Sequence, residues 1–220
     1  MAAFFHDLVE LIGSHPHFAF VTVFLLALSE AIPVVGTVVP GSTSIIGISA
    51  LGATANLNLW LLLIAATAGA ICGDGLSYWL GRRYHREILG AWPLNGYPQL
   101  IERSEAFIAR FGVASVFLAR FTAVVRAFVP LLAGILNMSA RQFYIANILS
   151  ALVWAPAHVF PGALLGLLAR LGGASAQHLV LLSIAGVILI STVWGLVRRP
   201  NDKSAGTRTV AGSGRARDRI

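Results

Sequence analysis

The sequence predicts an all-α integral membrane protein with two inverted re-entrant helical hairpins, about three transmembrane helices and short interfacial helices. Its composition excludes a soluble domain, because 57% of the 220 residues are hydrophobic and only 11% are charged, with a mean hydropathy of +0.78. Some of its apolar stretches are unbroken, whereas others are interrupted by proline, glycine and charged residues. Its positive charge gathers in one loop and in the C-terminal tail.

Three unbroken apolar stretches reach or approach the length of about 20 residues that a helix needs to cross a bilayer. They cover residues 57–81, 143–169 and 178–197. The first contains Asp74 and the second contains His158, so two of the predicted transmembrane helices carry a titratable side chain. The third has no such residue beyond its first position.

Two further apolar regions, residues 18–51 and 111–138, are broken in the middle and leave flanking arms of about 10 residues, too short to cross a bilayer alone. Short arms around a break are typical of a re-entrant hairpin, because loosened backbone at membrane depth must be covered by protein or line a wet cavity. The predicted breaks lie at Pro33, Gly36 and Pro40 in the first region, and between Arg120 and Arg126 and at Pro130 and Gly134 in the second.

The two broken regions resemble each other at a constant offset of 90 residues. SEAIPVVGTVVP (29–40) and ARFTAVVRAFVP (119–130) share three valines and a proline, and each hairpin is followed by a long apolar stretch. The chain is therefore expected to contain the same unit twice. The predicted organisation is an interfacial N-terminal helix (1–17), a first repeat (18–81), a cytoplasmic amphipathic loop (82–110), a second repeat (111–169), a C-terminal transmembrane helix (170–197) and a disordered basic tail (198–220). A short interfacial helix is also expected at 101–111.

Positive charge orients these units. The loop 82–110 carries five arginines and the tail 198–220 carries seven lysines and arginines, so both are expected on the cytoplasmic side. The first hairpin must then enter from the outer face and the second from the cytoplasmic face. This is an inverted repeat, the plan of many transporters, whose site lies near the midplane where the halves meet.

Four ionisable residues are predicted at membrane depth, where charged side chains persist only if they pair or line a wet path. Glu30 and Asp74 belong to the first repeat, whereas Arg120 and Arg126 belong to the second. One interpretation is a buried cluster of ion pairs that merely locks the two halves together. The functional interpretation is that the planar arginine forks hold a phosphate while a carboxylate takes up and releases a proton.

Other signals in the sequence favour structural roles. His158 is expected to be packed and hydrogen-bonded rather than a proton relay. The glycine pairs within 69–73 and 162–166 have the spacing that lets helices approach closely, which leaves a homodimer possible. The five tryptophans are expected mostly to be interfacial anchors. They are Trp60, Trp79, Trp92, Trp154 and Trp194.

No metal site, phosphate loop or nucleophile–base pair is visible in the sequence, so an enzyme is the weaker class and no cofactor or metal is expected. The single cysteine, Cys72, cannot form an intrachain disulfide. The basic tail is expected to touch anionic lipid headgroups, with RNA binding as the minor alternative, so nucleic acid is not an expected partner.

Three segments resemble the DedA family, the bacterial branch of the superfamily of VTT or SNARE-associated Golgi proteins. They are SEAIP…PG (29–41), GDGLSYWLGR (73–82) and FLARFTAVVRAFVPLLAG…M (117–138). The resemblance implies that the residues matching Glu30, Asp74, Arg120 and Arg126 are needed for function. It also implies lipid translocation, because bacterial members are similar to carriers of undecaprenyl phosphate and eukaryotic relatives to phospholipid scramblases. The chain departs from the family pattern at Ala123, where proline is usual, and at His85, where glycine is common.

The expected function is therefore translocation of undecaprenyl phosphate or a related lipid phosphate across the bacterial inner membrane, with membrane lipids as surroundings and protons or another ion as the coupling partner. The C-terminus is expected in the cytoplasm. Two alternatives remain open at this point. One is a proton-coupled transporter of small ions or osmolytes that uses the same four residues, and the other is a membrane assembly factor that transports nothing.

The orientation can be tested with single cysteines in a Cys72→Ala background. A cysteine at Asn56 is expected to react with an impermeant thiol reagent added outside the cell, because residues 52–58 carry no positive charge. A cysteine at Asn95, within the arginine-rich loop, should be protected until the membrane is opened. The opposite labelling pattern would contradict the inverted repeat.

Overall fold

The computed structural model describes residues 14–33, 35–90, 94–122 and 125–172, and these residues form helices and no strands. The predicted interfacial helix up to residue 13, the transmembrane helix at 178–197, the tail and Ala123 lie outside the described residues. The helices are α2 (Pro16–Glu30), α3 (Val35–Val38), α4 (Gly41–Thr54), α5 (Leu59–Tyr84), α6 (Glu87–Gly90), the 3-10 helix η1 (Leu94–Gly96), α7 (Pro98–Phe111), α8 (Ala114–Ala119), α9 (Val129–Ile135) and α10 (Ala140–Leu171).

Two helices of the described part, α5 with 26 residues and α10 with 32, are long and apolar enough to cross a membrane. At a rise of about 1.5 Å per residue both exceed the roughly 30 Å of a hydrocarbon core. They confirm the long helices predicted at 57–81 and 143–169. Each begins at a capping side chain, since Asn58 accepts hydrogen bonds from the backbone of α5 and Ser139 accepts one from that of α10. The helix α5 ends at His85, whose φ of 50° lies in the left-handed region that favours glycine.

The first hairpin consists of α2 and α4, with 15 and 14 residues, joined through α3. These arms are longer than the 10 residues predicted, yet at about 21–23 Å each is still too short to span a bilayer. The structure places Pro33 and Gly36 between the arms and Pro40 at the N-cap of α4. The interruption therefore lies where the sequence predicted it.

The second hairpin is shorter, with arms α8 and α9 of six and seven residues. Pro130 and Gly134 do not break it, contrary to the prediction. Both lie within α9, because proline is tolerated in the first turn of a helix and Gly134 packs closely against α5. The break covers the residues from Arg120, which caps α8, to Phe128, which caps α9.

The offset of 90 residues survives in the structure at both ends of the break. Glu30 ends α2, and Arg120 directly follows α8. Pro40 immediately precedes α4, and Pro130 lies in the first turn of α9. These two pairs of positions therefore lie at similar places in the two hairpins, although the arms differ in length.

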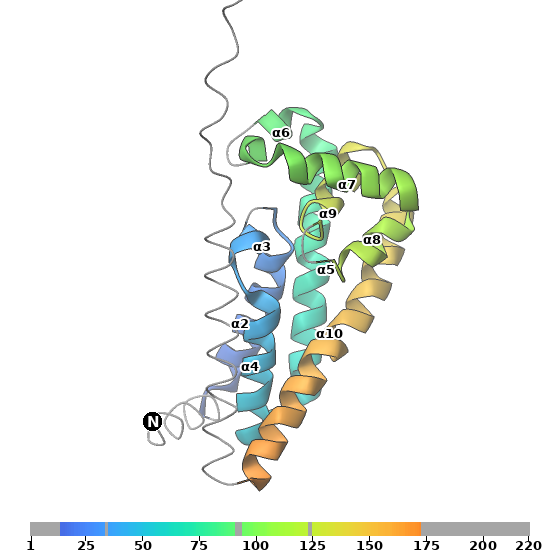
Figure 1. Ribbon diagram of the computed structural model, residues 1–220. Helices are drawn as coiled ribbons and strands as arrows, with labels where there is room; N and C mark the ends of the chain where they lie inside the picture. The colour runs from blue at the N-terminus through green and yellow to red at the C-terminus, as the bar shows by residue number, and fades with distance from the viewer. Residues whose placement is uncertain (1–13, 34, 91–93, 123–124, 173–220) are drawn as a thin grey trace, which may run out of the picture.

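The two hairpins approach each other from opposite ends of the molecule (Figure 1). In that view α2 and α4 rise from below with α3 uppermost, while α8 and α9 occupy the upper half beneath α7. Each long helix contacts both hairpins, because α5 packs against α2 and α9, and α10 packs against α4 and α8. This arrangement brings the connections of the two hairpins together, where Arg126 of the second meets Glu30 at the end of α2.

Glycines permit the close packing of the first hairpin. Gly69 and Gly73 of α5 lie against backbone carbonyls of α2, and Gly162 and Gly166 of α10 lie against those of α4, so a Cβ at any of these positions would collide with backbone. Both small-residue motifs are therefore used inside the chain. Neither is free to form the homodimer that its spacing alone allowed.

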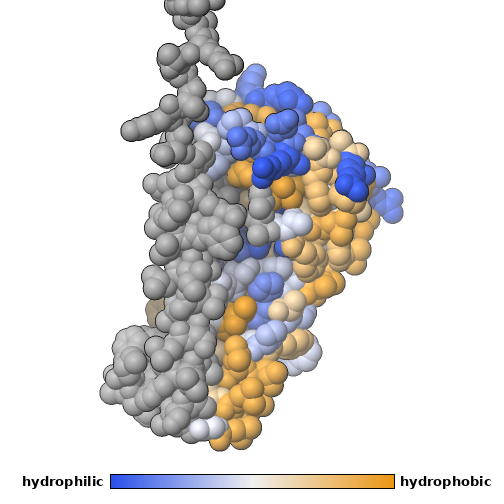
Figure 2. All heavy atoms as spheres, in the orientation of Figure 1, coloured by the Kyte–Doolittle hydropathy of each residue, from blue (hydrophilic) through white to orange (hydrophobic). Residues whose placement is uncertain are grey.

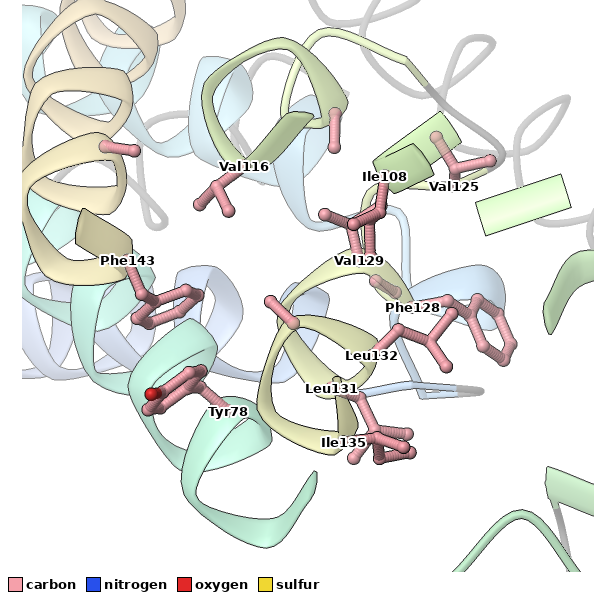
Figure 3. Packing of buried hydrophobic residues seen from close by; sticks show 14 of the residues in the cluster. Tyr78, Ile108, Val116, Val125, Phe128, Val129, Leu131, Leu132, Ile135 and Phe143 are labelled. Atoms are coloured by element: carbon pink, nitrogen blue, oxygen red, sulfur yellow. The ribbon is translucent and has the colours of Figure 1, made fainter. Parts of the chain in front are cut away.

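The helix α9 is the centre of the larger apolar cluster (Figure 3). All seven of its residues are buried, as expected for a helix that is apolar on every side. Around it lie Ile108 of α7, Val116 of α8 and the ring of Tyr78 from α5, which stacks on Phe143 of α10 at a centroid distance of 4.2 Å. The second hairpin is therefore enclosed between the two long helices and α7.

The outer surface is divided between apolar and polar regions. Large apolar side chains are exposed along α2, α5 and α10, and Figure 2 shows hydrophobic colour along α10 and hydrophilic colour gathered at the end that carries α6 and α7. The interfacial helix predicted at 101–111 falls within α7, which buries Ser104 and Ile108 and exposes most of its charged residues. Such a distribution suits a helix lying at a boundary between lipid and water.

Replacing Gly166 with alanine should test the packing of α4 on α10. In an unobstructed helix interior this change stabilises by about 1 kcal/mol, but here the new Cβ meets the carbonyl oxygen of Ala50, and overpacking costs about 1–3 kcal/mol. We expect a lower melting temperature in detergent and an unchanged oligomeric state. Gly96→Ala is the control, because nothing lies within 4 Å of that position. Equal melting temperatures for the two variants would contradict the packing argument.

Candidate functional site

The four predicted charged residues come together as two ion pairs, each joining the first repeat to the second. Arg120 binds Asp74, and Arg126 binds Glu30 through Nη1 and Oε1 at 2.8 Å. The acids come from α5 and the end of α2, and the bases from the break between α8 and α9. The hairpin connections that lie far apart in sequence therefore meet through opposite charges.

The Arg120 side chain of the first ion pair is held by three hydrogen-bonding partners. Besides Asp74, the guanidinium of Arg120 donates to Asn147 Oδ1 at 2.6 Å and to Ser150 Oγ at 3.0 Å. The side chains of Arg120 and Asp74 are only 5% and 10% exposed. Since Asn147 and Ser150 belong to α10, this guanidinium ties the second hairpin to both long helices.

The pair of Arg126 and Glu30 is less complete. Arg126 uses only Nη1, which donates to Glu30 and, at 3.3 Å, to Ser42 Oγ, while its other nitrogens donate to no described residue. The side chain of Arg126 is 16% exposed. A guanidinium carries five N–H donors, so Arg126 retains the capacity to bind a further anion.

Glu30 is buried although it lies beside the connection of the first hairpin. Its side chain is only 7% exposed because the start of α4 packs over it. Its Oε1 accepts hydrogen bonds from Arg126 and from Ser42 Oγ at 2.6 Å. Its Oε2 is buried and has no partner among the described residues.

Trp154 is part of this site and is not the interfacial anchor that its class suggested. It is 1% exposed in the middle of α10, and its ring lies 5.9 Å from the guanidinium carbon of Arg120 and 5.6 Å from that of Arg126. Its indole nitrogen is buried without a partner among the described residues. The ring supports both arginines, and its N–H is available to an acceptor.

Sequence reasoning missed Ser42, Asn147, Ser150 and Trp154 as members of the site. A signal was present, since Asn147, Ser150 and Trp154 have the spacing i, i+3, i+7 that places them on one face of a helix. His158, one turn further, has its Nδ1 2.8 Å from the carbonyl oxygen of Trp154 and packs on the Trp154 ring. This is the packed, hydrogen-bonded role predicted for that histidine.

A small cavity adjoins the charges. Its volume is about 10 Å³, room for a single water molecule. A phosphate group is larger than one water, so the arrangement seen here can admit an anion only if the two hairpin connections separate. The cavity is lined by the apolar Ala27, Ala31, Val116 and Pro130 and by Asp74, Arg120 and Arg126.

Comparison of the sequence with known proteins identifies relatives of this chain. The family model described as the VTT domain matches residues 39–164, a range that contains Asp74, Arg120 and Arg126 but begins after Glu30. No solved structure matches the chain.

The chain is similar to several membrane proteins of bacteria. It is 30% identical over 150 residues to the inner membrane protein YabI of Escherichia coli K12, covering 68% of this chain and 59% of YabI. It is 27% identical over 208 residues to the protein DedA of the same organism, covering 91% of each chain. A membrane protein of Synechocystis is 34% identical over 140 residues, covering 60% of each chain. The chain thus spans less than two thirds of YabI and of the Synechocystis protein.

The two arginines should respond unequally to replacement by lysine. Arg120→Lys removes a three-way set of hydrogen bonds, and each buried partner left without a donor costs about 1–3 kcal/mol, so the melting temperature in detergent should fall clearly. Arg126→Lys replaces a side chain that uses one nitrogen, so its melting temperature should change little. Thermal unfolding of both variants measures the difference, and an equal loss would contradict the assignment of a fixed and an exchangeable pair.

Proposed function

Because the chain belongs to the VTT-domain family of membrane proteins, which includes the DedA proteins, we propose that it is a lipid translocase of the bacterial inner membrane. Its cargo in this proposal is a lipid phosphate, with undecaprenyl phosphate as the first candidate, returned from the outer to the inner leaflet with coupling to protons. The observation that carries the proposal is the position of Arg126. It lies where the two hairpin connections meet, and most of its donors are unused by the described residues.

The two ion pairs have different tasks in this proposal. Arg120 and Asp74 form a permanent anchor, because three partners on two long helices hold the guanidinium. Arg126 and Glu30 form the exchangeable pair, in which the arginine fork suits the oxygens of a phosphate. Trp154 lies beneath both arginines and offers an N–H to the same ligand.

The lengths and surfaces of the helices support a placement in the membrane for this proposal. The exposed apolar side chains of α2, α5 and α10 contact the acyl chains, and the polar end with α6 and α7 faces the cytoplasm. The hairpins are then re-entrant, the first from outside and the second from the cytoplasm, and their connections meet near the midplane. A headgroup arriving from either leaflet would reach the same arginine.

Transport requires the connections to part, because the cavity beside Arg126 holds no more than one water. The connection of the first hairpin is suited to such a movement, since it contains only the four-residue α3 and is joined to α4 through Pro40. The second hairpin is held more firmly by the core around α9. We therefore assign the larger movement to the first hairpin.

The size of the cavity also favours a second candidate, a proton-coupled transporter of small ions or osmolytes. A small ion needs less separation of the hairpins than a lipid headgroup does. The two candidates differ in what competes for Arg126, since only the lipid translocase binds a ligand with a long apolar tail.

The experiment is transport in proteoliposomes with a fluorescent polyprenyl phosphate, measured by the accessibility of the label to an external quencher. The wild-type protein should move the label between leaflets, and Arg126→Lys should slow it about tenfold or more, because losing charge-assisted hydrogen bonds of a fork costs about 1.5–3 kcal/mol. Arg141→Lys, at an exposed arginine remote from the site, should be as fast as wild type.

Two results would count against this function. If the wild-type protein does not move the lipid but changes the internal pH or ion content of the same vesicles, the small-ion candidate is correct. If Arg126→Lys transports as fast as wild type, simple charge neutralisation suffices and the phosphate grip is wrong.

A further inference from the structure

The Glu30 carboxylate occupies a place that resembles a binding site for an anion. One oxygen, Oε1, accepts hydrogen bonds from the Arg126 guanidinium and the Ser42 hydroxyl. The other, Oε2, lies against the first residue of α4, where a Cβ on Gly41 would come within 2.6 Å of it. A side chain at position 41 would therefore displace this oxygen, which has no hydrogen-bond partner among the described residues.

The start of α4 supplies further donors at the same place. This 14-residue helix has no side-chain cap, and the first amides of an α-helix have no acceptor within the helix itself. Such amides and the helix dipole make a helix N-terminus attractive to negative charge. The unpartnered oxygen of Glu30, on a side chain more than nine-tenths buried, lies against Gly41, the first residue of this helix.

The charges around Glu30 balance as the structure stands. Arg126 faces it from the second hairpin, and Arg120 and Asp74 lie behind from α8 and α5, while α4 contributes only the neutral Ser42. Two guanidinium groups and two carboxylates sum to zero. Adding a singly charged phosphate would leave one buried negative charge in excess, which is costly at membrane depth unless it is neutralised.

We infer that Ser42, Arg126 and the N-terminus of α4 form one anion-binding place, which the Glu30 carboxylate fills in this structure and which the phosphate of the cargo fills after Glu30 takes up a proton. This inference rests on the proposed function and specifies how its site works. The proton moves from water to the carboxylate of Glu30, whose charge and hold on Arg126 are lost. The phosphate brings the charge that Glu30 gave up, and on release the proton returns to water and Glu30 returns to its place.

This exchange explains features that a simple salt bridge does not need. A permanent pair would be expected to use more of the arginine fork, as Arg120 does when its Nε and Nη2 donate to Ser150, Asn147 and Asp74. Instead, Glu30 leaves one oxygen unpaired, and Arg126 leaves most of its donors unused by the described residues. The place fits a ligand with more oxygens than a carboxylate has.

The test is binding of dodecyl phosphate to the purified protein in nanodiscs, by calorimetry, over a pH series from about 5 to about 8, with inorganic phosphate as a second probe. Affinity of the wild-type protein should rise as the pH falls, approaching tenfold per unit for one linked proton. In Glu30→Gln the affinity should be high throughout, and only the titration of the phosphate itself should remain. Melting temperatures establish that each variant is folded.

A second pair of variants tests the place without altering a titratable group. Ser42→Ala removes a donor from the proposed place and should weaken dodecyl phosphate binding about three- to tenfold while the pH dependence persists. Ser44→Ala is the control, because the Ser44 hydroxyl donates to the carbonyl oxygen of Pro40 and not to Glu30. Its affinity should equal that of wild type.

The outcomes separate this inference from the proposed function. Unchanged pH dependence in Glu30→Gln, or equal affinities for the two serine variants, would overturn the shared anion place while leaving lipid translocation intact. Wild-type protein that binds neither probe at any pH would overturn both. If inorganic phosphate binds as tightly as dodecyl phosphate with the same dependence on Glu30, the shared place is correct and the cargo is free phosphate.

Discussion

The balance of charge among four largely buried ionisable side chains is the constraint on which the rest of this structure depends. Neither repeat could bury its own charges alone, because the first contributes only acids and the second only bases to the site. Asp74 is paired only when the second hairpin packs against α5, and Glu30 is paired only when the two hairpin connections meet. The glycines that bring α2 against α5, and α4 against α10, set the hairpins where this meeting occurs. Folding and assembly of the site are therefore the same event.

The two hairpins differ from each other around this shared site. The second hairpin is short, buried on every side of α9, and anchored by Arg120 to both long helices. The first hairpin has longer arms, and its connection carries the incomplete pair with Arg126. A firmly packed half and a less completely paired half would suit the alternating access that the proposed transport requires. The asymmetry is thus part of the proposed mechanism.

Much of this could be predicted from the sequence, and the failures have physical causes. Hydropathy and helix length predicted α5 and α10, and the cost of buried charge predicted that Glu30, Asp74, Arg120 and Arg126 would gather. Pro130 and Gly134 were wrongly read as breaks, because proline in a first helical turn and glycine at a close helix contact look the same in sequence as a true interruption. Trp154 was predicted to be an interfacial anchor because tryptophans often are. Its helical spacing from Asn147 and Ser150 would instead have placed it with the site.

In the proposed exchange, the Glu30 carboxylate and the phosphate of the cargo bind alternately at one site. The most direct measurement is therefore the proton uptake that accompanies phosphate binding. Purified protein in a weakly buffered solution would be titrated with dodecyl phosphate while a pH indicator reports the protons removed from solution. We expect the wild-type protein to take up about one proton per phosphate more than Glu30→Gln does. Equal uptake by the two proteins, with equal amounts of phosphate bound, would contradict it.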